Sequence, residues 1–311
     1  MSATTRRNVL KGGLGLASLG GVADLFAKNA DCGVRVAKEE DELLDLWQRE
    51  TDETASAAYK MYWSDGDVRG LKSLEKVEAA FAKVMREAKE TVVTGDRPAV
   101  WSVYNMGYIV KTRDAMFSID LVHRRAAEFA PLLDFALVTH NHGDHFHRGL
   151  YNAMNGAGKT VISNFLDNYG VKGWRKNGGY IRGTKRFRLK DVEISTSLID
   201  HNDYLVDFTT AFEIRVGSFR MYHTGDSGKG TEPKLNTVWG RPDLWLFFPG
   251  CGINTAKAVS KVNAKRVVFG HLWELAHGSG RLTAPLIRRA LGDARSRCNA
   301  VSFALWGDRI C

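Results

Sequence analysis

The sequence predicts an α/β fold in which sheets are covered by helices, preceded by a helical extension. Two observations indicate this. Residues 38–92 of the 311-residue chain read as helical, because apolar side chains recur there at the spacing of one helix face. From about residue 97 onward, short apolar or alternating runs of strand length are mixed with helical stretches, which is typical of helix-covered sheets.

The helical extension carries an apolar stripe at helical spacing. Its members are Leu71, Leu74, Val77, Phe81, Val84, Met85 and Ala88. Such a stripe favours core packing over a partner site. Leu43, Leu44 and Trp47 indicate a shorter helix before it. The sequence is compatible with helices that pack on the following domain, cover its pocket or mediate oligomerisation.

The part of the chain after residue 97 is expected to supply the sheets. Strands are predicted at residues 99–110, 115–122, 135–138, 186–199, 209–223, 244–248, 267–269 and 300–306, and a helix at 282–291. No internal repeat interrupts this pattern.

A dense group of metal-ligand side chains follows the strand predicted at 135–138. His140, His142, Asp144 and His145 fall within six residues, so one loop presents several nitrogen and oxygen ligands to one point. An H-x-H-x-D-H string is expected by chance in roughly one chain per thousand or fewer of this composition. A solvated polar loop is the alternative, and the density of imidazoles argues against it.

Three further predicted strands also end in ligand-type residues. Asp200 and His201 follow one strand, Asp226 follows the second, and His271 follows the third. All nine histidines lie beyond residue 122. Four strand ends that finish in this way predict one shared metal centre.

The order of these residues resembles the metallo-β-lactamase superfamily, and specifically its branch of ascorbate-6-phosphate lactonase-like hydrolases. The likeness covers roughly residues 97–295, and it includes Ser118-Ile119-Asp120, the run 243–250 and Asn254-Thr255. The resemblance implies a four-layer αββα sandwich with the metal site at one edge, between the sheets.

The resemblance also implies a site for two divalent metal ions. Its ligands would be His140, His142 and His201 for one ion, Asp144, His145 and His271 for the second, and Asp226 bridging both. Neutral imidazoles and carboxylates favour zinc, with manganese or iron as alternatives. Two cations lower the pKa of a bridging water, and Asp144 is the expected catalytic residue that orients this water or accepts its proton.

Each ligand has a structural alternative. His201 could decorate a turn, His271 could be a satisfied core histidine, and Asp226 could cap the turn 224–228. His277, in a glycine-rich loop, is a weaker substitute for His271. Three other residues are expected beside the ligands: Asp120 as an orienting group, and His147 and His223 in orienting, substrate-facing or structural roles.

The amino terminus resembles a twin-arginine export signal. Arg6 and Arg7 precede a mildly apolar stretch, 12–26, that is too short and glycine-rich for a confident membrane span. The predicted organisation is therefore a signal peptide at 1–30, a helical extension at 31–95 and a hydrolase domain at 96–311. This predicts recognition by the twin-arginine export machinery and a periplasmic or secreted location, with a disordered basic tail as the alternative.

Charge and cysteine usage add weaker constraints. Four of the 44 Lys and Arg and one of the 35 Asp and Glu lie in residues 1–30, so the remainder carries a net charge of +6. This modest excess is compatible with an anionic small-molecule substrate and does not indicate a specific nucleic-acid partner. Of the four cysteines, Cys298 and Cys311 are the nearest pair for a disulfide, whereas Cys251 is expected to be a free thiol.

Together these features predict an exported, dinuclear metal-dependent hydrolase that uses a metal-bound hydroxide. The scissile bond would be an ester, a lactone or a phosphodiester. The alternative from another class is a non-catalytic, metal-binding envelope protein.

Overall fold

The computed structural model describes residues 37–54, 59–60, 63–67, 69–165, 184–275 and 282–311. The predicted signal peptide, Cys32 and His277 lie outside these residues.

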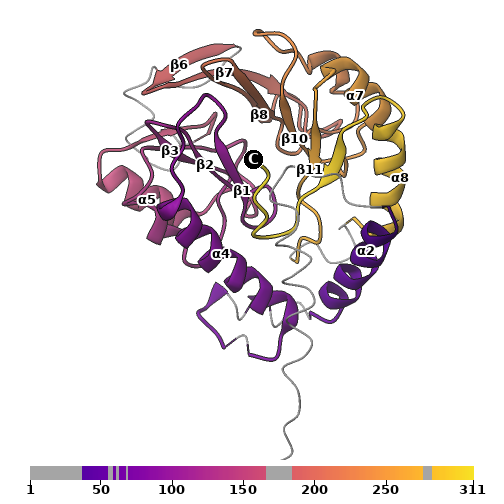
Figure 1. The fold of residues 1–311 in the computed structure, drawn as a ribbon, viewed down its shortest axis with the longest axis horizontal. Helices are drawn as coiled ribbons and strands as arrows, with labels where there is room; N and C mark the ends of the chain where they lie inside the picture. The colour runs from indigo at the N-terminus through magenta and orange to yellow at the C-terminus, as the bar shows by residue number, and fades with distance from the viewer. Residues whose placement is uncertain (1–36, 55–58, 61–62, 68, 166–183, 276–281) are drawn as a thin grey trace, which may run out of the picture. The chain divides into compact units, whose positions relative to one another are not determined.

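The described chain contains a five-stranded and a seven-stranded sheet (Figure 1). In sheet order, the first consists of β1 (Ala99–Ser102), β2 (Tyr108–Lys111), β3 (Met116–Ile119), β4 (Phe135–Leu137) and β5 (Thr160–Ile162). The second consists of β12 (Val301–Phe303), β11 (Val267–Phe269), β10 (Leu244–Phe247), β9 (Phe219–His223), β8 (Thr209–Val216), β7 (Val192–Ile199) and β6 (Lys185–Leu189).

The central strand β10 shows why both faces of the second sheet are covered. Its residues point alternately to opposite faces. Leu244 and Leu246 belong to the core cluster that also contains the first sheet. Trp245 and Phe247 belong to a second cluster on the other face. All four are buried, as expected for a strand between two parallel neighbours.

Helices cover the outer faces of the two sheets. α4 (Lys72–Glu90) and α5 (Arg148–Gly156) pack on the first sheet, where α4 buries Phe81, Val84 and Ala88 of the predicted stripe, while Leu74 and Val77 join the second cluster. α7 (Thr255–Val262) and α8 (Ala284–Arg295) pack on the second sheet. The order of layers is helix, sheet, sheet, helix (Figure 1). Among the residues that the structure describes, short 3₁₀ turns at Ala126–Phe129 and Glu232–Lys234 connect these elements.

The helical extension packs on the sheet-containing part of the chain. Trp47 of α2 (Ala37–Asp52) lies 5.2 Å from Trp273 and 4.8 Å from Trp306, measured between ring centroids. Asp41 of the same helix pairs with Arg288 of α8 at 2.7 Å. Of the roles that the sequence left open, packing on the following domain is therefore observed. None of the helices in the described part of the chain has the length and apolarity that a membrane crossing requires.

Three predicted strands are in fact hairpins. Residues 186–199 form β6 and β7, residues 209–223 form β8 and β9, and residues 99–110 form β1 and β2. The prediction of continuous strands was wrong because apolar residues continue on both sides of each turn. Two residues separate β6 from β7 and β8 from β9, and residues 103–107 separate β1 from β2. Between β6 and β7, the chain reverses at Lys190, which adopts φ +55°. A non-glycine residue in this conformation leaves little trace in the sequence.

The strand directions bring the ligand-type residues to one edge. β9 is parallel to β10 and β11, and β7 points the same way because β8 is antiparallel to both β7 and β9. The chain leaves these strands toward His201, Asp226 and His271. In the first sheet, β4 leads directly into the loop 139–145. Side chains from both sheets therefore meet at the carboxyl ends of the strands, where α/β folds place their sites.

Candidate metal centre

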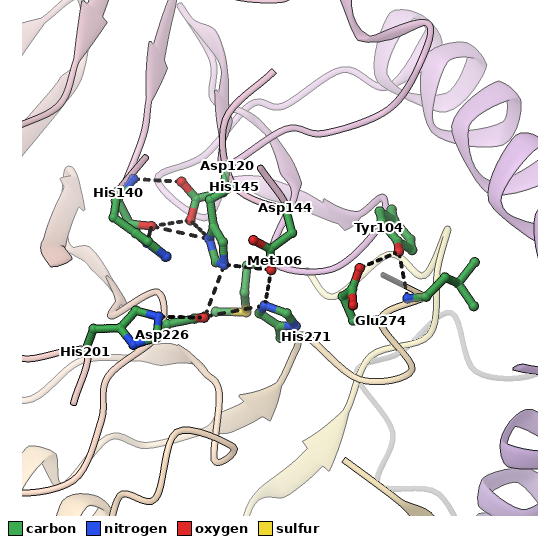
Figure 2. A network of polar contacts seen from close by, with 12 residues as sticks. Tyr104, Met106, Asp120, His140, Asp144, His145, His201, Asp226, His271 and Glu274 are labelled. Atoms are coloured by element: carbon green, nitrogen blue, oxygen red, sulfur yellow. Dashed lines mark hydrogen bonds and ion pairs between the residues drawn. The ribbon is translucent and has the colours of Figure 1, made fainter. Parts of the chain in front are cut away.

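The loop that follows β4 is oriented by one buried carboxylate. Asp120 Oδ1 accepts a hydrogen bond from the Thr139 backbone N–H, and Asp120 Oδ2 accepts one from the Thr139 hydroxyl, both at 2.7 Å. Asp120 Oδ2 also lies 2.9 Å from His145 Nδ1 (Figure 2). This contact keeps a proton on Nδ1 and turns Nε2 toward the centre, where it would offer its lone pair to a bound cation. Asp120 thus has the orienting position that the sequence predicted.

The first ligand group consists of three imidazoles. His140, His142 and His201 each offer a ring nitrogen, and these atoms all lie within 4.8 Å of one another. His140 is fully buried, whereas His142 and His201 are half-buried. Three convergent imidazoles of this kind fit a zinc-like ion, and the two partly exposed rings leave one side of the group accessible.

The second ligand group is fully buried and contains two carboxylates. It consists of Asp144, His145, Asp226 and His271, whose ligand atoms also lie within 4.8 Å of one another. Asp144 Oδ2 is 3.0 Å from His271 Nε2, and Asp226 Oδ1 is 3.2 Å from His145 Nε2 (Figure 2). The oxygen-richer donor set is the one that also suits manganese or iron.

Asp226 lies between the two groups and directs one oxygen to each. Its Oδ1 atom faces His145 Nε2 at 3.2 Å and His271 Nε2 at 3.5 Å. Its Oδ2 atom is 3.4 Å from His201 Nε2. A carboxylate in this position has the geometry of a bridging ligand.

Backbone constraints hold the ligand loops close together. Gly225 has φ +48°, and a Cβ there would overlap the Thr139 side chain. A Cβ at Gly228 would overlap the His201 carbonyl. His271 also has a positive φ, +60°, and its N–H donates to the Asn105 carbonyl at 3.1 Å. A non-glycine residue in this region costs roughly 1–3 kcal/mol, a strain that is typical of functional sites.

The pKa values of the buried groups move in opposite directions. Burial alone would lower the pKa of His145, but Asp226, Asp144 and Asp120 outweigh it and raise this pKa well above its usual value. Burial alone would raise the pKa of Asp226, but His145 and His271 hold it well below its usual range. For His140, burial is the main cause of a strongly lowered pKa, and His145 adds to it. The site therefore combines ionised carboxylates with a neutral imidazole, and both are metal ligands.

The ligand atoms are better satisfied by bound metal ions than by hydrogen bonds among themselves. His140 Nε2 is buried and has no hydrogen-bond partner, although the Thr139 hydroxyl contacts its other nitrogen, Nδ1, at 2.9 Å. A buried polar atom without a partner costs roughly 1–3 kcal/mol. Coordination of a cation would satisfy this atom and the carboxylates around His145 together.

Cys251 and Cys298 are free thiols. Cys251 offers its sulfur atom to a third group, with His201 and Asp226, in which the ligand atoms lie within 4.8 Å of one another. Burial raises the pKa of this thiol, and Asp226 raises it further. Cys298 and Cys311 are not linked, so the predicted pairing was wrong. The thiol of Cys298 instead lies near the carbonyl oxygens of Ala264 and Lys265.

A cleft of about 650 Å³ opens beside the ligand groups. Its described lining residues are Tyr59, Trp63, His142, Gly143, Asp144, Phe146 and His147. Tyr59 and Trp63 come from the segment between α2 and α4, and no sequence motif indicates that they reach the site. His142 and Asp144 connect the cleft to the first and second ligand groups.

The other predicted histidines have mainly structural contacts. His147 Nδ1 accepts the Leu150 backbone N–H at 3.1 Å, which caps α5, while the same residue also lines the cleft. His223 Nε2 lies 3.3 Å from Asp120 Oδ2 and so supports the residue that orients His145.

The chain matches no protein-family model. Over 126 residues it is 33% identical to a metal-dependent hydrolase from Heliobacterium modesticaldum, and the alignment covers 37% of this chain and 52% of that protein. The chain thus matches about half the length of this curated relative.

Solved structures share the fold at low sequence identity. YhfI from Bacillus subtilis, a metallo-β-lactamase fold protein, is 15% identical with a TM-score of 0.50, covering 68% of this chain and 98% of that one. CmlA from Streptomyces venezuelae, a diiron β-hydroxylase, is 13% identical with a TM-score of 0.52, covering 68% of this chain and 53% of that one. The predicted fold class is confirmed: the chain has the metallo-β-lactamase fold with an additional N-terminal helix. The lactonase branch stays a prediction.

Proposed function

We propose that this chain is a metal-dependent hydrolase with a dinuclear site that cleaves an ester, a lactone or a phosphodiester. One observation carries the proposal: Asp226 directs one oxygen to each of two ligand groups. The name of the Heliobacterium relative, a metal-dependent hydrolase, supports the same reaction class.

The residues of the chain have distinct roles in the proposed reaction. His140, His142 and His201 would hold one ion, Asp144, His145 and His271 would hold the other, and Asp226 would hold both. When bound, two divalent ions supply a water of lowered pKa and polarise the scissile carbonyl or phosphoryl group. Asp120 fixes the ring of His145 through Nδ1 and so keeps Nε2 aimed at the centre.

Of the two roles predicted for Asp144, orientation of the attacking water is favoured. Its carboxylate lines the cleft, so it can accept a hydrogen bond from a water placed there. Burial alone would raise the pKa of Asp144, but His145 and His271 hold it well below its usual value. A weakly basic carboxylate orients a water well but retains a proton poorly at neutral pH.

The proposed location rests on the sequence. Arg6 and Arg7, followed by the apolar stretch, support export by the twin-arginine machinery to the periplasm or beyond. Export of the folded chain would let the cell load the metal before secretion.

The test is hydrolysis by protein that has been loaded separately with zinc, manganese or ferrous iron. Phenyl acetate, a γ-lactone and bis(p-nitrophenyl) phosphate represent the three bonds, and the assays are run with and without oxygen. We expect oxygen-independent cleavage of at least one substrate, lost in Asp226→Asn. Asp203→Asn is the matched control, because Asp203 is an exposed carboxylate that pairs with Lys229. Stoichiometric metal without turnover of any substrate would instead favour a non-catalytic metal-binding envelope protein.

A further inference from the structure

The N-terminal segment closes one side of the cleft with aromatic rings. Tyr59 and Trp63 lie between α2 and α4 in sequence, and both line the cleft together with Phe146. His142 and Asp144 line the same cleft from the metal-ligand loop. The cleft therefore has an aromatic part and a part that offers metal ligands.

The aromatic rings are held in place by other rings. The Trp63 centroid lies 6.0 Å from that of Tyr59 at an interplanar angle of 83°, and 6.0 Å from that of His147 at 30°. Phe146 stacks on buried Tyr151 at 5.0 Å and 4°. The Tyr59 hydroxyl also lies 3.4 Å from that of Tyr104. Rings that are already held lose little freedom when a ligand binds, so they form a pre-organised surface.

The chemistry of the lining favours an uncharged, flat group. Among the lining residues that the structure describes, Asp144 is the one acidic residue and none is Lys or Arg. An anionic group on the aromatic side would gain no counter-charge from these residues. Apolar and aromatic linings with few polar groups, in cavities of roughly 300–1,000 Å³, are typical of small-molecule sites.

We propose that this cleft binds a neutral ester or lactone through a flat apolar group, aromatic or cyclic, that packs against Trp63 and Phe146. The scissile bond then lies beside His142 and Asp144. The assignment of an ester or lactone bond rests on the proposed hydrolysis, whereas the binding of the flat group is independent of it. Trp63 becomes a specificity-determining residue that the N-terminal extension supplies.

The first test is a binding measurement on the metal-free, full-length chain, in which no turnover occurs. 2-Naphthyl acetate, ethyl acetate and 2-naphthyl phosphate are titrated by calorimetry. These probes separate the contribution of the ring from that of negative charge. We expect naphthyl acetate to bind more tightly than either of the other two.

Substitutions then locate the binding surface. We expect Trp63→Ala to weaken naphthyl acetate binding about three- to tenfold, since an aromatic pair contributes on this scale. Trp63→Phe should stay within about twofold of the original, because it keeps a flat ring. Trp239→Ala is the matched control, because Trp239 is half-buried, packs over Arg215 and does not line the cleft. Phe146→Ala provides a second variant, and its thermal midpoint shows whether the chain has folded.

Two results would overturn the inference. One is unchanged naphthyl acetate binding in both folded variants, Trp63→Ala and Phe146→Ala. The other is tighter binding of naphthyl phosphate than of naphthyl acetate, which would indicate an anionic substrate.

Binding of the flat group in the cleft and hydrolysis by the metal-loaded protein can fail independently. If ring-dependent binding occurs but metal-loaded protein hydrolyses neither naphthyl nor ethyl acetate, the cleft assignment stands and the hydrolase proposal fails. If both esters are hydrolysed and Trp63→Ala lowers kcat/KM equally for each, hydrolysis stands and the cleft assignment fails.

Discussion

The two ligand groups differ in burial and in charge. His140, His142 and His201 form a group of imidazoles in which two rings are half-buried and one borders the cleft. The group of Asp144, His145, Asp226 and His271 is wholly buried and includes two carboxylates, with Asp120 behind it. Both groups reach the cleft, the first through His142 and the second through Asp144, but the second group is more buried and more firmly held.

This difference shows how one fold can make two unlike sites from neighbouring strand ends. Residues two apart in the same loop, His142 and Asp144, contribute to different groups. Asp226 joins the groups because one residue offers two oxygen atoms on opposite sides. A substitution that affects both groups should therefore have the largest effect on the protein. One that affects a single group should have a smaller effect, and one that affects neither should have the smallest.

The largest effect is expected for Asp226→Asn, because this residue contacts both groups. Groups behind a metal ligand typically contribute 10- to 100-fold to metal affinity, so loss of a shared ligand should exceed roughly 100-fold. The amide replaces an ionised carboxylate at nearly constant volume. Metal content should fall below one equivalent, and hydrolysis should be abolished. Normal metal content with full activity would exclude the bridging role.

Asp120→Asn should weaken the second group more than the first, because Asp120 contacts His145 directly and His140 only through the Thr139 hydroxyl. The substitution removes the charge that holds His145 by Nδ1, and we expect a loss of metal affinity of about 10- to 100-fold at one of two sites. Titration with a chromogenic chelator should resolve one nearly normal and one weakened site. Equal weakening of both sites would show that the groups are not separable.

His123 is an imidazole away from the carboxylates of the second group, and it shows how burial changes the pKa of such a ring. It stacks on Phe81 at 4.0 Å, and burial, aided by Arg125, Arg124 and His147, lowers its pKa to about 3. Glu78 faces it at 3.7 Å. Because the folded pKa lies below the unfolded value of 6.5, the stabilisation is present above pH 6.5 and is lost as the pH falls toward 3.

The expected size of this pH effect is roughly 2 kcal/mol between pH 7 and pH 5, from 1.36 kcal/mol per pH unit. His123→Phe keeps a flat ring against Phe81 but cannot bind a proton. Denaturant unfolding of metal-free protein should therefore show a smaller loss of stability over this range in the variant. Equal losses would mean that His123 does not titrate as described.

The smallest effect is expected at His147, beside the cleft. His147→Ala removes the cap of α5 and should cost about 1 kcal/mol of stability, whereas His147→Asn restores an acceptor for the Leu150 N–H. Thermal unfolding of the two variants measures this difference. If His147→Asn restores stability but not kcat/KM, the imidazole also acts on the substrate.

The sequence predicted the fold class because its strand ends finish in ligand-type residues in a recognisable order. It also predicted which residues the structure brings together, since loops at the carboxyl ends of parallel strands share one edge. It did not predict the three hairpins. In two of them, alternation persists across a two-residue turn, and at one of these turns Lys190 reverses the chain without a glycine.

The sequence did not predict the aromatic side of the cleft. Tyr59 and Trp63 lie about 80 residues before the metal-ligand loop, and an aromatic residue in a helical stretch reads as core. Their approach to the site depends on how α2 and α4 pack on the sheets, which periodicity does not encode. The proposed pair of Cys298 and Cys311 failed for a similar reason, because nearness in sequence does not fix nearness in space.

If two metal ions share Asp226, each chain binds two ions, and the metal content per chain measures this number. The protein is purified from its native compartment without added metal and is analysed by plasma mass spectrometry. About two equivalents of zinc, manganese or iron per chain are expected, the stoichiometry of a two-metal hydrolytic site. Substantially less than one equivalent, even after reconstitution, would contradict the account.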